Sequence, residues 1–509
     1  MGVARVYLVG AGPGDPGLLT LRGRDVLGRA DVVVYDALIA EPLLDLAPGG
    51  AERVYVGKRS GRHAMSQDGI NQLLIDRARA GKTVVRLKGG DPFIFGRGGE
   101  EALAMAAAGV RFEVVPGVTA ATAAAACAGI PLTHRGLAGS VALITGHQAA
   151  EDGDAELDWP SLASWRGTLA FYMGVANLAG ICRKLIAHGL PADTPAAVIH
   201  WGATPRQKVA SGTVESLPAR AEEAKIAPPA LIVIGNVVAL REKLRWFESR
   251  PLFGKRIAVT RARPQASELA ALLEAAGAEV ITCPTIRIAP TDDPQPLKQA
   301  AAEIGTFDWL VLTSVNGVDA LWTALQSHGL DARALAGCRI AVVGPATAER
   351  LAVFGLRADL QPQTYTTAAL AEELRSACKL KGKRVLCPRS DAAPPDLSDA
   401  LAAAGAQVTE VVAYRTVPDH SGARPVLEML EADGLHWLTF TSSSTVTNFL
   451  AAVDARRVAR SSVRIASIGP VTSRAIRSAG LSVAVEAENH TVHGLAEAII
   501  AVESSRKDG

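Results

Sequence analysis

The stretch VYLVGAGPGDPGLL, residues 6–19, decides which kind of α/β fold opens the chain. Two glycines follow an apolar strand, and Asp36 lies near the end of the next strand, which is close to the pattern of a dinucleotide-binding unit. The sixth position of that pattern, normally glycine or alanine, is Asp15 here. Pro13 and Pro16 also remove N–H donors that would meet a pyrophosphate. The sequence therefore predicts a loop shaped for another ligand and disfavours an NAD-dependent dehydrogenase.

Composition indicates a globular protein of several domains. The chain has 509 residues, of which 49% are hydrophobic and 20% charged, so more than one core is expected. A formal net charge of +2 gives no reason to expect a nucleic-acid partner. The six cysteines show no metal-ligand spacing, so we expect reduced thiols and no metal. The chain enters a strand pattern without a leader, and its most apolar stretch is too short to span a membrane, which favours the cytoplasm.

Apolar runs rich in valine and isoleucine alternate with helical spacing in the first half, which favours α/β with largely parallel strands. A change of pattern at Pro131 predicts two subdomains, about 1–132 and 133–247. The largest break falls near 250, so we expect a linker at 248–253. The runs lie at 3–9, 31–35, 53–56, 83–87 and 111–115, and then at 141–145, 168–173, 196–200 and 230–235.

The second half of the chain repeats itself, with offsets of 128, 128 and 125 residues between three pairs of segments. Each copy reads as strand, helix, strand, helix, strand, Gly-Pro turn and helix. The repeat predicts two similar α/β lobes with a ligand cleft between them. The matching segments are 254–280 with 382–408, 309–321 with 437–450, and 339–351 with 464–476.

Two further loops in the first half follow strands and carry glycine. VVRLKGGDPFIFGRGGEE (84–101) places a Gly-Gly-Asp turn after a strand, and VVPGVTAATAAA (114–125) opens a helix near Thr119. Each alone is a common turn. Three such loops at the edge where α/β sheets bind ligands predict a binding site.

These motifs, with VVVYDALI (32–39), GKRSGRH (57–63) and AGIPLTHRG (128–136), resemble the S-adenosylmethionine-dependent uroporphyrinogen-III C-methyltransferases of the tetrapyrrole methylase family, over about residues 3–247. The resemblance implies a two-subdomain fold unlike the Rossmann methyltransferases. It also implies S-adenosylmethionine in the cleft between the subdomains, S-adenosylhomocysteine as product, and a homodimer. By position, the cofactor contacts fall on Pro13, Gly89, Gly90, Asp91, Ile94, Thr119, Ala120, Met173 and Gly202. The family's Gly-Thr-x-x-x-Gln motif is altered here by Ala203, which follows Gly202.

The same resemblance makes Asp36 a proton acceptor and Lys58 a proton donor. Such a pair suits a reaction in which a macrocycle carbon takes a methyl group and protons then redistribute. Outside these motifs, Asp36 would read as a helix cap and Lys58 as a solvated charge. The implied substrate is a polycarboxylate, so a cationic surface beside the expected cleft is predicted. That charge would come from GKRSGRH (57–63), with Arg59, Arg62 and His63, from Arg86, Lys88 and Arg97, and from THR (133–135).

The second half shows no nucleophile–base pair, metal site or phosphate loop. Hydroxyl side chains recur at strand ends, where they are either carboxylate ligands or ordinary helix N-caps. The candidates are Thr313, Ser314, Ser442 and Ser443.

The segments LTSVNGV, VGPATAERL, AYRTV and IASIGPVTSRAI resemble uroporphyrinogen-III synthase over about 254–505. The resemblance implies an interleaved fold, with lobe one from about 254–288 plus 418–505 and lobe two from about 289–417. It also implies cofactor-free closure of hydroxymethylbilane into uroporphyrinogen III, with ring inversion and loss of water. Tyr414 matches a tyrosine suspected of assisting departure of the hydroxyl group, and fits equally well as an aromatic side chain at the lobe's edge.

The sequence thus predicts a bifunctional enzyme whose second half makes uroporphyrinogen III and whose first half methylates it twice to precorrin-2, towards sirohaem or cobalamin. Its partners would be linear and cyclic tetrapyrroles, without nucleic acid or membrane. One alternative treats the second half as a non-catalytic, two-lobed ligand sensor. Others within the methylases are enzymes for a later corrin intermediate or for diphthamide.

Overall fold

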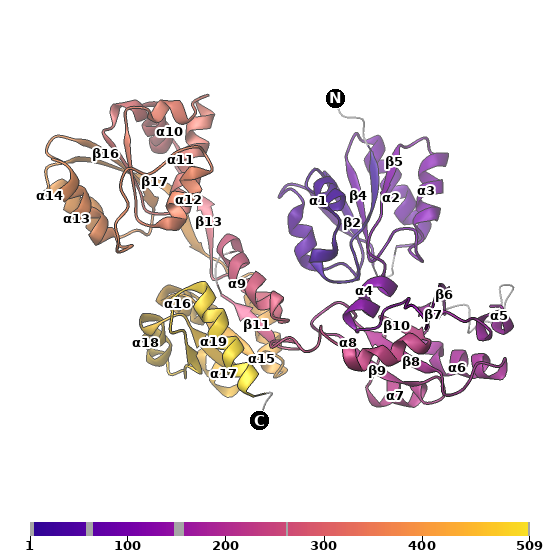
Figure 1. Cartoon of the computed structure of the whole chain (residues 1–509). Helices are drawn as coiled ribbons and strands as arrows, with labels where there is room; N and C mark the ends of the chain where they lie inside the picture. Colours follow the sequence, from indigo (N-terminus) through magenta and orange to yellow (C-terminus); the bar gives the residue numbers. More distant parts are fainter. Residues whose placement is uncertain (1–4, 58–64, 147–156, 261–262, 507–509) are drawn as a thin grey trace. The chain divides into compact units, whose positions relative to one another are not determined.

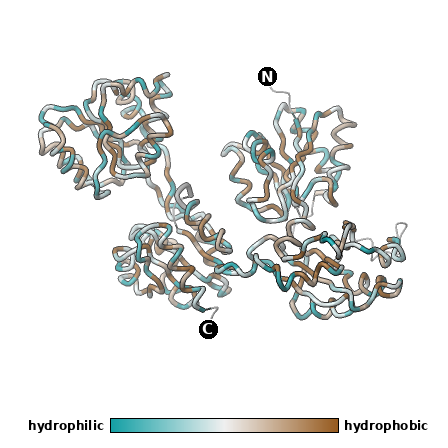
Figure 2. Tube along the Cα trace, in the orientation of Figure 1, coloured by the Kyte–Doolittle hydropathy of each residue, from teal (hydrophilic) through white to brown (hydrophobic). Residues whose placement is uncertain are grey.

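The computed structural model describes residues 5–57, 65–146, 157–260 and 263–506 and divides into two compact units. The first unit contains Met1–Arg256, with Leu273–Glu279 and Ile500–Gly509, and the second contains Ile257–Leu272 and Val280–Ile499. Hydrophobic residues are concentrated in the strands, and hydrophilic residues in the outer helices and loops (Figure 2). The fold is α/β, as predicted.

The first sheet of unit one is parallel throughout, in the order β3-β2-β4-β1-β5. Helices α2 and α3 pack on one face, and α1 with a short 3-10 helix packs on the other, so the strands are buried on both sides and read as continuous apolar runs. The strands are β1 Val6–Gly10, β2 Val32–Tyr35, β3 Glu52–Tyr55, β4 Val84–Lys88 and β5 Phe112–Val115. The helices are α1 Leu21–Leu27, α2 Gln67–Arg79 and α3 Gly98–Ala107, with 3-10 turns at Pro16–Leu18 and Glu41–Leu46.

The second sheet has the order β6-β7-β10-β8-β9 and is mixed. Only β6 and β7 run parallel, and the other three neighbouring pairs are antiparallel, so the expectation of largely parallel strands is wrong here. The edge strand β9 was not anticipated, because KVASGT has few apolar residues and includes a glycine. The strands are β6 Val141–Thr145, β7 Thr168–Tyr172, β8 Pro195–His200, β9 Lys208–Thr213 and β10 Ala230–Ile234. The helices are α5 Trp159–Ala163, α6 Leu178–Ala187, α7 Leu217–Glu223 and α8 Arg241–Leu244, with 3-10 turns at Val175–Asn177 and Asn236–Leu240.

Helix α4, Ala120–Cys127, joins the two subdomains of unit one (Figure 1). It follows β5 of the first sheet, yet its alanines pack against β7, β8 and β10 of the second sheet. Alanine side chains let the helix lie close to that sheet. The start of α4 is therefore held at the carboxyl edge of the first sheet and its body on the second.

Two more sheets lie mostly in unit two, with strand orders β12-β11-β18-β19-β20 and β13-β17-β16-β14-β15. The first comprises β11 Arg256–Val259, β12 Glu279–Thr282, β18 Trp437–Phe440, β19 Arg464–Ser467 and β20 Val485–Glu486, with helices α9 Arg263–Ala275, α15 Ala423–Glu431, α16 Ser443–Ala452, α17 Ala455–Arg460, α18 Pro470–Ser478 and α19 Val492–Ser505. The second comprises β13 Ile286–Pro290, β14 Trp309–Leu312, β15 Arg339–Val342, β16 Arg384–Ser390 and β17 Gln407–Pro418, with α10 Gln295–Ala302, α11 Val315–Ser327, α12 Pro345–Ala352, α13 Thr367–Ala377 and α14 Asp396–Ala403, and 3-10 turns at Ile304–Thr306 and Ala332–Leu335.

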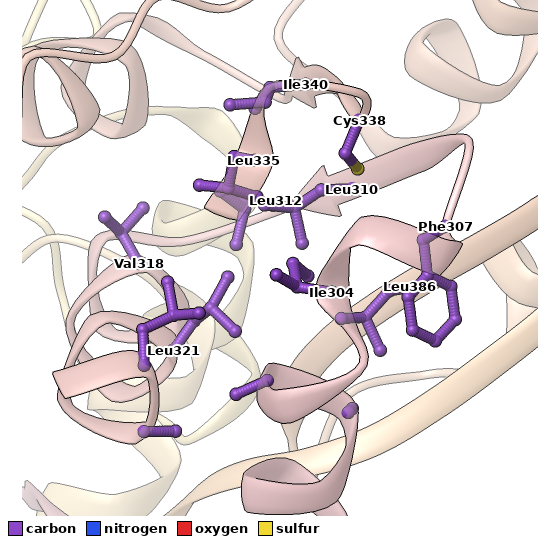
Figure 3. Close-up of a cluster of buried hydrophobic side chains, with 14 of the residues drawn as sticks. Ile304, Phe307, Leu310, Leu312, Val318, Leu321, Leu335, Cys338, Ile340 and Leu386 are labelled. Atoms are coloured by element: carbon purple, nitrogen blue, oxygen red, sulfur yellow. The ribbon is translucent and has the colours of Figure 1, made fainter. Parts of the chain in front are cut away.

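Each of these two sheets contains strands from both copies of the sequence repeat. Strands β11 and β12 come from the first copy but pair in one sheet with β18 and β19 of the second copy. Strands β14 and β15 of the first copy likewise pair with β16 and β17 of the second. Each sheet has its own core, and that of the second sheet is built around Leu310, Leu312 and Leu386 (Figure 3).

Candidate functional site

The carboxyl edge of the first sheet gathers four loops. Because β2, β4, β1 and β5 are neighbouring parallel strands, the residues that follow each of them emerge at one edge. Asp36 follows β2, the Gly-Gly-Asp turn follows β4, Pro13 lies beyond β1, and Thr119 lies beyond β5. Strand order thus makes neighbours of residues that are far apart in the chain.

Glycine is required where these loops touch. A Cβ atom on Gly10 would lie 2.5 Å from the Cα of Gly117 and 2.7 Å from the carbonyl oxygen of Gly90. The N–H of Gly90 donates to the carbonyl of Gly12 over 2.8 Å, and Gly90 has φ +68°, a left-handed conformation. The three glycine-bearing loops therefore form one rigid floor.

The second subdomain supplies the opposite wall. Strands β7 and β8 both run antiparallel to β10, so their carboxyl ends share an edge. Met173 follows β7, and Trp201 and Gly202 follow β8. Tyr172, the last residue of β7, accepts the N–H of Ala121 over 2.9 Å and shares a 2.7 Å hydrogen bond with the Thr119 hydroxyl.

Between these walls lies a pocket of about 710 Å³, within the size range of small-molecule sites. All nine residues expected to contact the cofactor line it, and so does Asp36. Four lining residues that are not glycine adopt left-handed backbone conformations: Phe95 (φ 50°), Arg97 (φ 58°), Met173 (φ 53°) and Trp201 (φ 46°). Such conformations cost energy and concentrate at functional sites.

All the charged side chains of the lining come from the first subdomain, whereas the lining residues of α4 and the second subdomain are mainly apolar, and we call these two groups the polar and the apolar end. The polar end holds Asp36, Gln67, Arg86, Lys88 and Arg97. The apolar end holds side chains such as those of Ala124, Val175, Ala176, Ile199 and Leu231. A ligand with an apolar and a charged part would be oriented by this difference.

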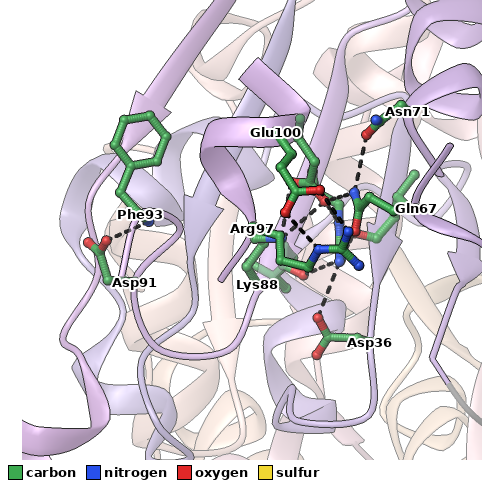
Figure 4. A network of polar contacts seen from close by, with 12 residues as sticks. Asp36, Gln67, Asn71, Lys88, Asp91, Phe93, Arg97 and Glu100 are labelled. Carbon is green, nitrogen blue, oxygen red and sulfur yellow. Dashed lines mark hydrogen bonds and ion pairs between the residues drawn. The ribbon is translucent and has the colours of Figure 1, made fainter. Parts of the chain in front are cut away.

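Two carboxylates at this edge of the sheet, those of Asp91 and Asp36, already contact other groups of the protein. Asp91 accepts the N–H of Phe93 over 2.8 Å (Figure 4). It also accepts the N–H of Gly117 over 2.9 Å, so it ties the second loop to the third. Asp36 accepts the N–H of Leu38 over 3.2 Å, as a cap would, while its other oxygen lies 3.4 Å from the Arg86 guanidinium. The Asp36 side chain is 27% exposed and still borders the pocket.

A buried charge network stands behind the polar end (Figure 4). The Glu101 carboxylate on α3 lies 3.1 Å from Arg86 Nε and 3.0 Å from Lys88 Nζ. Burial and the neighbouring Arg86 guanidinium lower the pKa of Lys88, and Glu101 opposes them. Burial also raises the pKa of Tyr172, so this phenol stays protonated at neutral pH.

Four predicted residues, Lys58, Arg59, Arg62 and His63, lie outside the described residues. The structure brings together several that sequence reasoning did not single out, namely Gln67, Glu101, Tyr172 and Trp201. Two of them directly precede the predicted Met173 and Gly202, and Glu101 ends the quoted glycine-rich motif. Their positions were visible in the sequence, but their contacts across strands were not.

In unit two, Tyr414 and Ser314 meet. Their hydroxyl oxygens are 3.0 Å apart, although the residues are 100 positions apart in the chain. Ser314 also caps α11 by accepting the N–H of Gly317 over 3.0 Å, and Ser442 forms a capping box on α16 with Thr445. Both serines therefore serve as N-caps. Thr313 directly follows β14, and Ser443 opens α16.

Among the described residues, no group of three or more histidine, cysteine, aspartate or glutamate side chains is placed to hold a metal ion. Within the same part of the chain, no helix has both the length and the apolar character needed to cross a membrane.

Comparison with known proteins finds one family match in each half of the chain. Residues 5–218 match the family described as Tetrapyrrole (Corrin/Porphyrin) Methylases, and residues 267–497 match the family described as Uroporphyrinogen-III synthase HemD. The Porphyrin biosynthesis protein HemD of Ruminiclostridium josui is 37% identical over 497 residues, which cover 98% of each chain. The Siroheme synthase of Pseudomonas fluorescens (strain Pf0-1) is 57% identical over 243 residues, 48% of this chain and 52% of its own. The match thus spans about half the length of that relative.

Solved structures resemble each half. Uroporphyrin III C-methyl transferase from Thermus thermophilus is 44% identical with a TM-score of 0.40, over 46% of this chain and 99% of its own. A second structure of that protein is complexed with S-adenyl homocysteine. A mutant uroporphyrinogen III synthase, also from Thermus thermophilus, is 20% identical with a TM-score of 0.38, over 50% of this chain and 100% of its own.

Proposed function

We propose that this chain, which belongs to the family of fused tetrapyrrole methylases and uroporphyrinogen-III synthases, carries out two consecutive reactions of tetrapyrrole biosynthesis. The second half closes hydroxymethylbilane into uroporphyrinogen III with ring inversion and loss of water. The first half then transfers two methyl groups from S-adenosylmethionine to that product and gives precorrin-2. The product of one site is the substrate of the other.

One observation carries the methyltransferase assignment: the nine expected cofactor residues come from separate loops of two subdomains and line a single pocket. The fold alone does not require this arrangement, since the same loops could pack against one another and leave no pocket between them. The pocket also has the size and the mixed polarity of a nucleoside-derivative site.

The residues present fit S-adenosylmethionine. Gly90 lines the pocket and adds no side chain to it; a Cβ there would lie 3.8 Å from the N of Ala120 and 3.9 Å from the Cα of Thr119. Thr119 and Ala120 stand at the start of α4 and line the pocket, so a ligand there meets the beginning of this helix. Met173 and the apolar end would enclose the adenosyl group, and the bound sulfonium would supply an activated methyl group.

Asp36 is the proposed proton acceptor. A carbon–carbon bond to the macrocycle forms as the methyl–sulfur bond breaks with its electron pair left on sulfur, and the macrocycle then gives up a proton. Asp36 borders the polar end, and its Oδ2 lies 3.4 Å from the Arg86 guanidinium. A partly exposed carboxylate at the pocket wall is placed to accept that proton.

In the synthase half, the proposed group is Tyr414. Its hydroxyl is oriented by Ser314 at 3.0 Å. A phenol held in this way can donate a hydrogen bond to a departing hydroxyl group, while the fold of the bound chain is set by positioning. The rival proposal, a ligand-sensing second half, predicts no ring closure at all.

Purified protein supplied with hydroxymethylbilane, with and without S-adenosylmethionine, tests both halves. After oxidation, chromatography and mass measurement identify the macrocycle. We expect uroporphyrin III without the methyl donor and a dimethylated product with it. Formation of only the symmetrical type I isomer, which arises spontaneously, would exclude a working synthase and favour the sensor. Methylation of supplied uroporphyrinogen III tests the first half separately.

A further inference from the structure

Three charged side chains beside the pocket are almost fully buried. Arg86 and Lys88 on β4 are each 5% exposed, and Glu101 on α3 is fully buried. Because Arg86 and Lys88 are two positions apart on one strand, they point to the same face of the sheet, towards α3. There the Glu101 carboxylate forms ion pairs with both side chains.

The contacts converge on one carboxylate. Glu101 Oε1 accepts Arg86 Nε over 3.1 Å, Lys88 Nζ over 3.0 Å and Gln67 Nε2 over 3.3 Å. Among the described residues, Glu101 Oε2 is buried without a hydrogen-bond partner and has only its ion-pair contact with Lys88 at 3.0 Å. Asp36 lies near Arg86 but at the longer distance of 3.4 Å.

Structural stability alone does not explain this arrangement. A buried ion pair is costly to desolvate, and replacement by apolar side chains is often neutral or stabilising. One cation would match the buried Glu101, yet β4 is a central strand that carries two, and the second carboxylate in reach, Asp36, lies 3.4 Å from Arg86 and is itself partly exposed in the pocket lining. Both cations line the pocket, whereas Glu101 does not. The second cation is explained if the pair faces an anionic ligand.

We propose that Glu101 is a positioning residue that holds Arg86 and Lys88 together at the pocket wall, where the two cations bind a carboxylate of the tetrapyrrole substrate. The inference rests on the proposed methyltransferase function. The methyl donor also has a carboxylate, but its own ammonium and sulfonium groups offset that charge. A tetrapyrrole polycarboxylate has no such internal compensation, so the cationic wall favours it.

Glu101 would have a second effect, on the charge of Lys88. The charged groups that act on Lys88 are Arg86, Glu101 and Asp36; burial and Arg86 lower its pKa, while the carboxylates raise it. Loss of Glu101 would lower the pKa further, so Lys88 would lose its proton at a lower pH. An arginine at position 88 would keep its charge without this help.

The test compares Glu101→Gln, Lys88→Met and Lys88→Arg in the full chain, with methyl transfer to supplied uroporphyrinogen III as the assay. Glu113→Gln is the matched control, because Glu113 also joins two arginines, Arg5 at 3.1 Å and Arg22 at 2.7 Å, without lining the pocket. Calorimetric binding of S-adenosylhomocysteine reports the cofactor subsite independently.

We expect Glu101→Gln and Lys88→Met to raise the KM for uroporphyrinogen III about tenfold to a hundredfold. Affinity for S-adenosylhomocysteine should stay close to that of the unmodified protein, and Lys88→Arg should retain most of the substrate affinity. The Glu101→Gln defect should grow as pH rises, because the lysine then loses its proton at a lower pH than in the unmodified protein, and adding Lys88→Arg to it should remove that pH dependence.

Other outcomes overturn the inference. An equal loss of S-adenosylhomocysteine affinity would assign the cations to the methyl donor. An unchanged KM, with only a lower Tm as in Glu113→Gln, would make the network structural. If Glu101→Gln does not fold, the comparison of Lys88→Met with Lys88→Arg still decides. Failure of the unmodified protein to methylate uroporphyrinogen III would instead refute the proposed function, and this inference with it.

Discussion

The hydroxyl group of Tyr172, at the end of β7, lies 2.7 Å from the hydroxyl group of Thr119, the residue before α4. The Thr119 side chain does not cap α4. Instead, the Tyr172 hydroxyl caps this helix by accepting the N–H of Ala121. The ring of Tyr172 also packs against Phe95, 4.9 Å away between centroids. The pair thus ties the two subdomains together at the pocket.

Tyr172→Phe removes this tie and keeps the ring. Since each hydrogen bond contributes about 1 kcal/mol, we expect S-adenosylhomocysteine to bind roughly five- to tenfold more weakly. Calorimetry measures the change. Tyr7→Phe on β1, which does not line the pocket, is the control, and equal effects of the two substitutions would contradict the prediction.

Gly117→Ala should disrupt the floor of the pocket. The new Cβ would lie 2.3 Å from the carbonyl oxygen of Gly90 and 2.7 Å from the Cα of Gly10, and both are backbone atoms that cannot rotate away. We expect a loss of stability of at least about 2 kcal/mol and of S-adenosylhomocysteine binding. Gly99→Ala on α3 is the control. No atom lies within 4 Å of its new Cβ, so the Tm should be unchanged or higher.

Asp36→Asn should slow methyl transfer without weakening the cofactor site. A positioned acid or base contributes about 10²–10⁴-fold, and asparagine keeps the hydrogen bond to Leu38 N–H but cannot take a proton. Steady-state kinetics with supplied uroporphyrinogen III should show the loss in kcat. Asp45→Asn, which alters only a surface pair with Arg53 at 3.5 Å, is the control. An equal kcat in both variants would exclude Asp36 as the acceptor.

Tyr414→Phe should reduce ring closure and leave the methyltransferase half unaffected. The substitution removes the hydroxyl that contacts Ser314 but keeps the aromatic packing in the second lobe. We expect more of the type I isomer from hydroxymethylbilane and normal methylation of supplied uroporphyrinogen III. Tyr365→Phe alters an exposed tyrosine and serves as control. Normal yield of the type III isomer would support the interpretation of Tyr414 as a packing residue.

Most cysteines should resist alkylation in the folded protein. Burial raises the pKa of Cys127 and Cys182 to about 11, and of Cys283, Cys338 and Cys387 to about 12. Cys378 alone among the six is not fully buried. At about pH 8, just below the ordinary thiol pKa, a thiol reagent should therefore label Cys378 first, as peptide mass analysis would show.

The same shifts have a consequence for stability. A thiol whose pKa is raised by folding binds its proton more tightly in the native state, so its contribution is complete below the ordinary thiol pKa and is lost as pH rises through the native value. Chemical denaturation should show falling stability above about pH 9. Rapid labelling of all six thiols in the native protein would contradict the burial on which this rests.

The sequence by itself determined the α/β class, the positions of the strands with continuous apolar runs, and the repeat in the second half. These are local properties: β1, β2 and β4 are valine-rich because both faces of each strand are covered. Resemblance added the residues expected to contact the cofactor, since their motifs stand as short unbroken stretches. The edge strand β9 is not predicted, because its glycine-containing sequence lacks a continuous apolar run.

Only the tertiary structure decided which residues meet. The order β3-β2-β4-β1-β5 brings Asp36, Gly90 and Thr119 to one edge, and nothing in the local sequence specifies that order. Glu101 receives two cations, Tyr172 caps a helix that follows a strand of the other sheet, and strands of one repeat pair with strands of the other. Each depends on pairing between distant segments, whose free energy comes from packing and hydrogen bonds that exist only once the chain has folded.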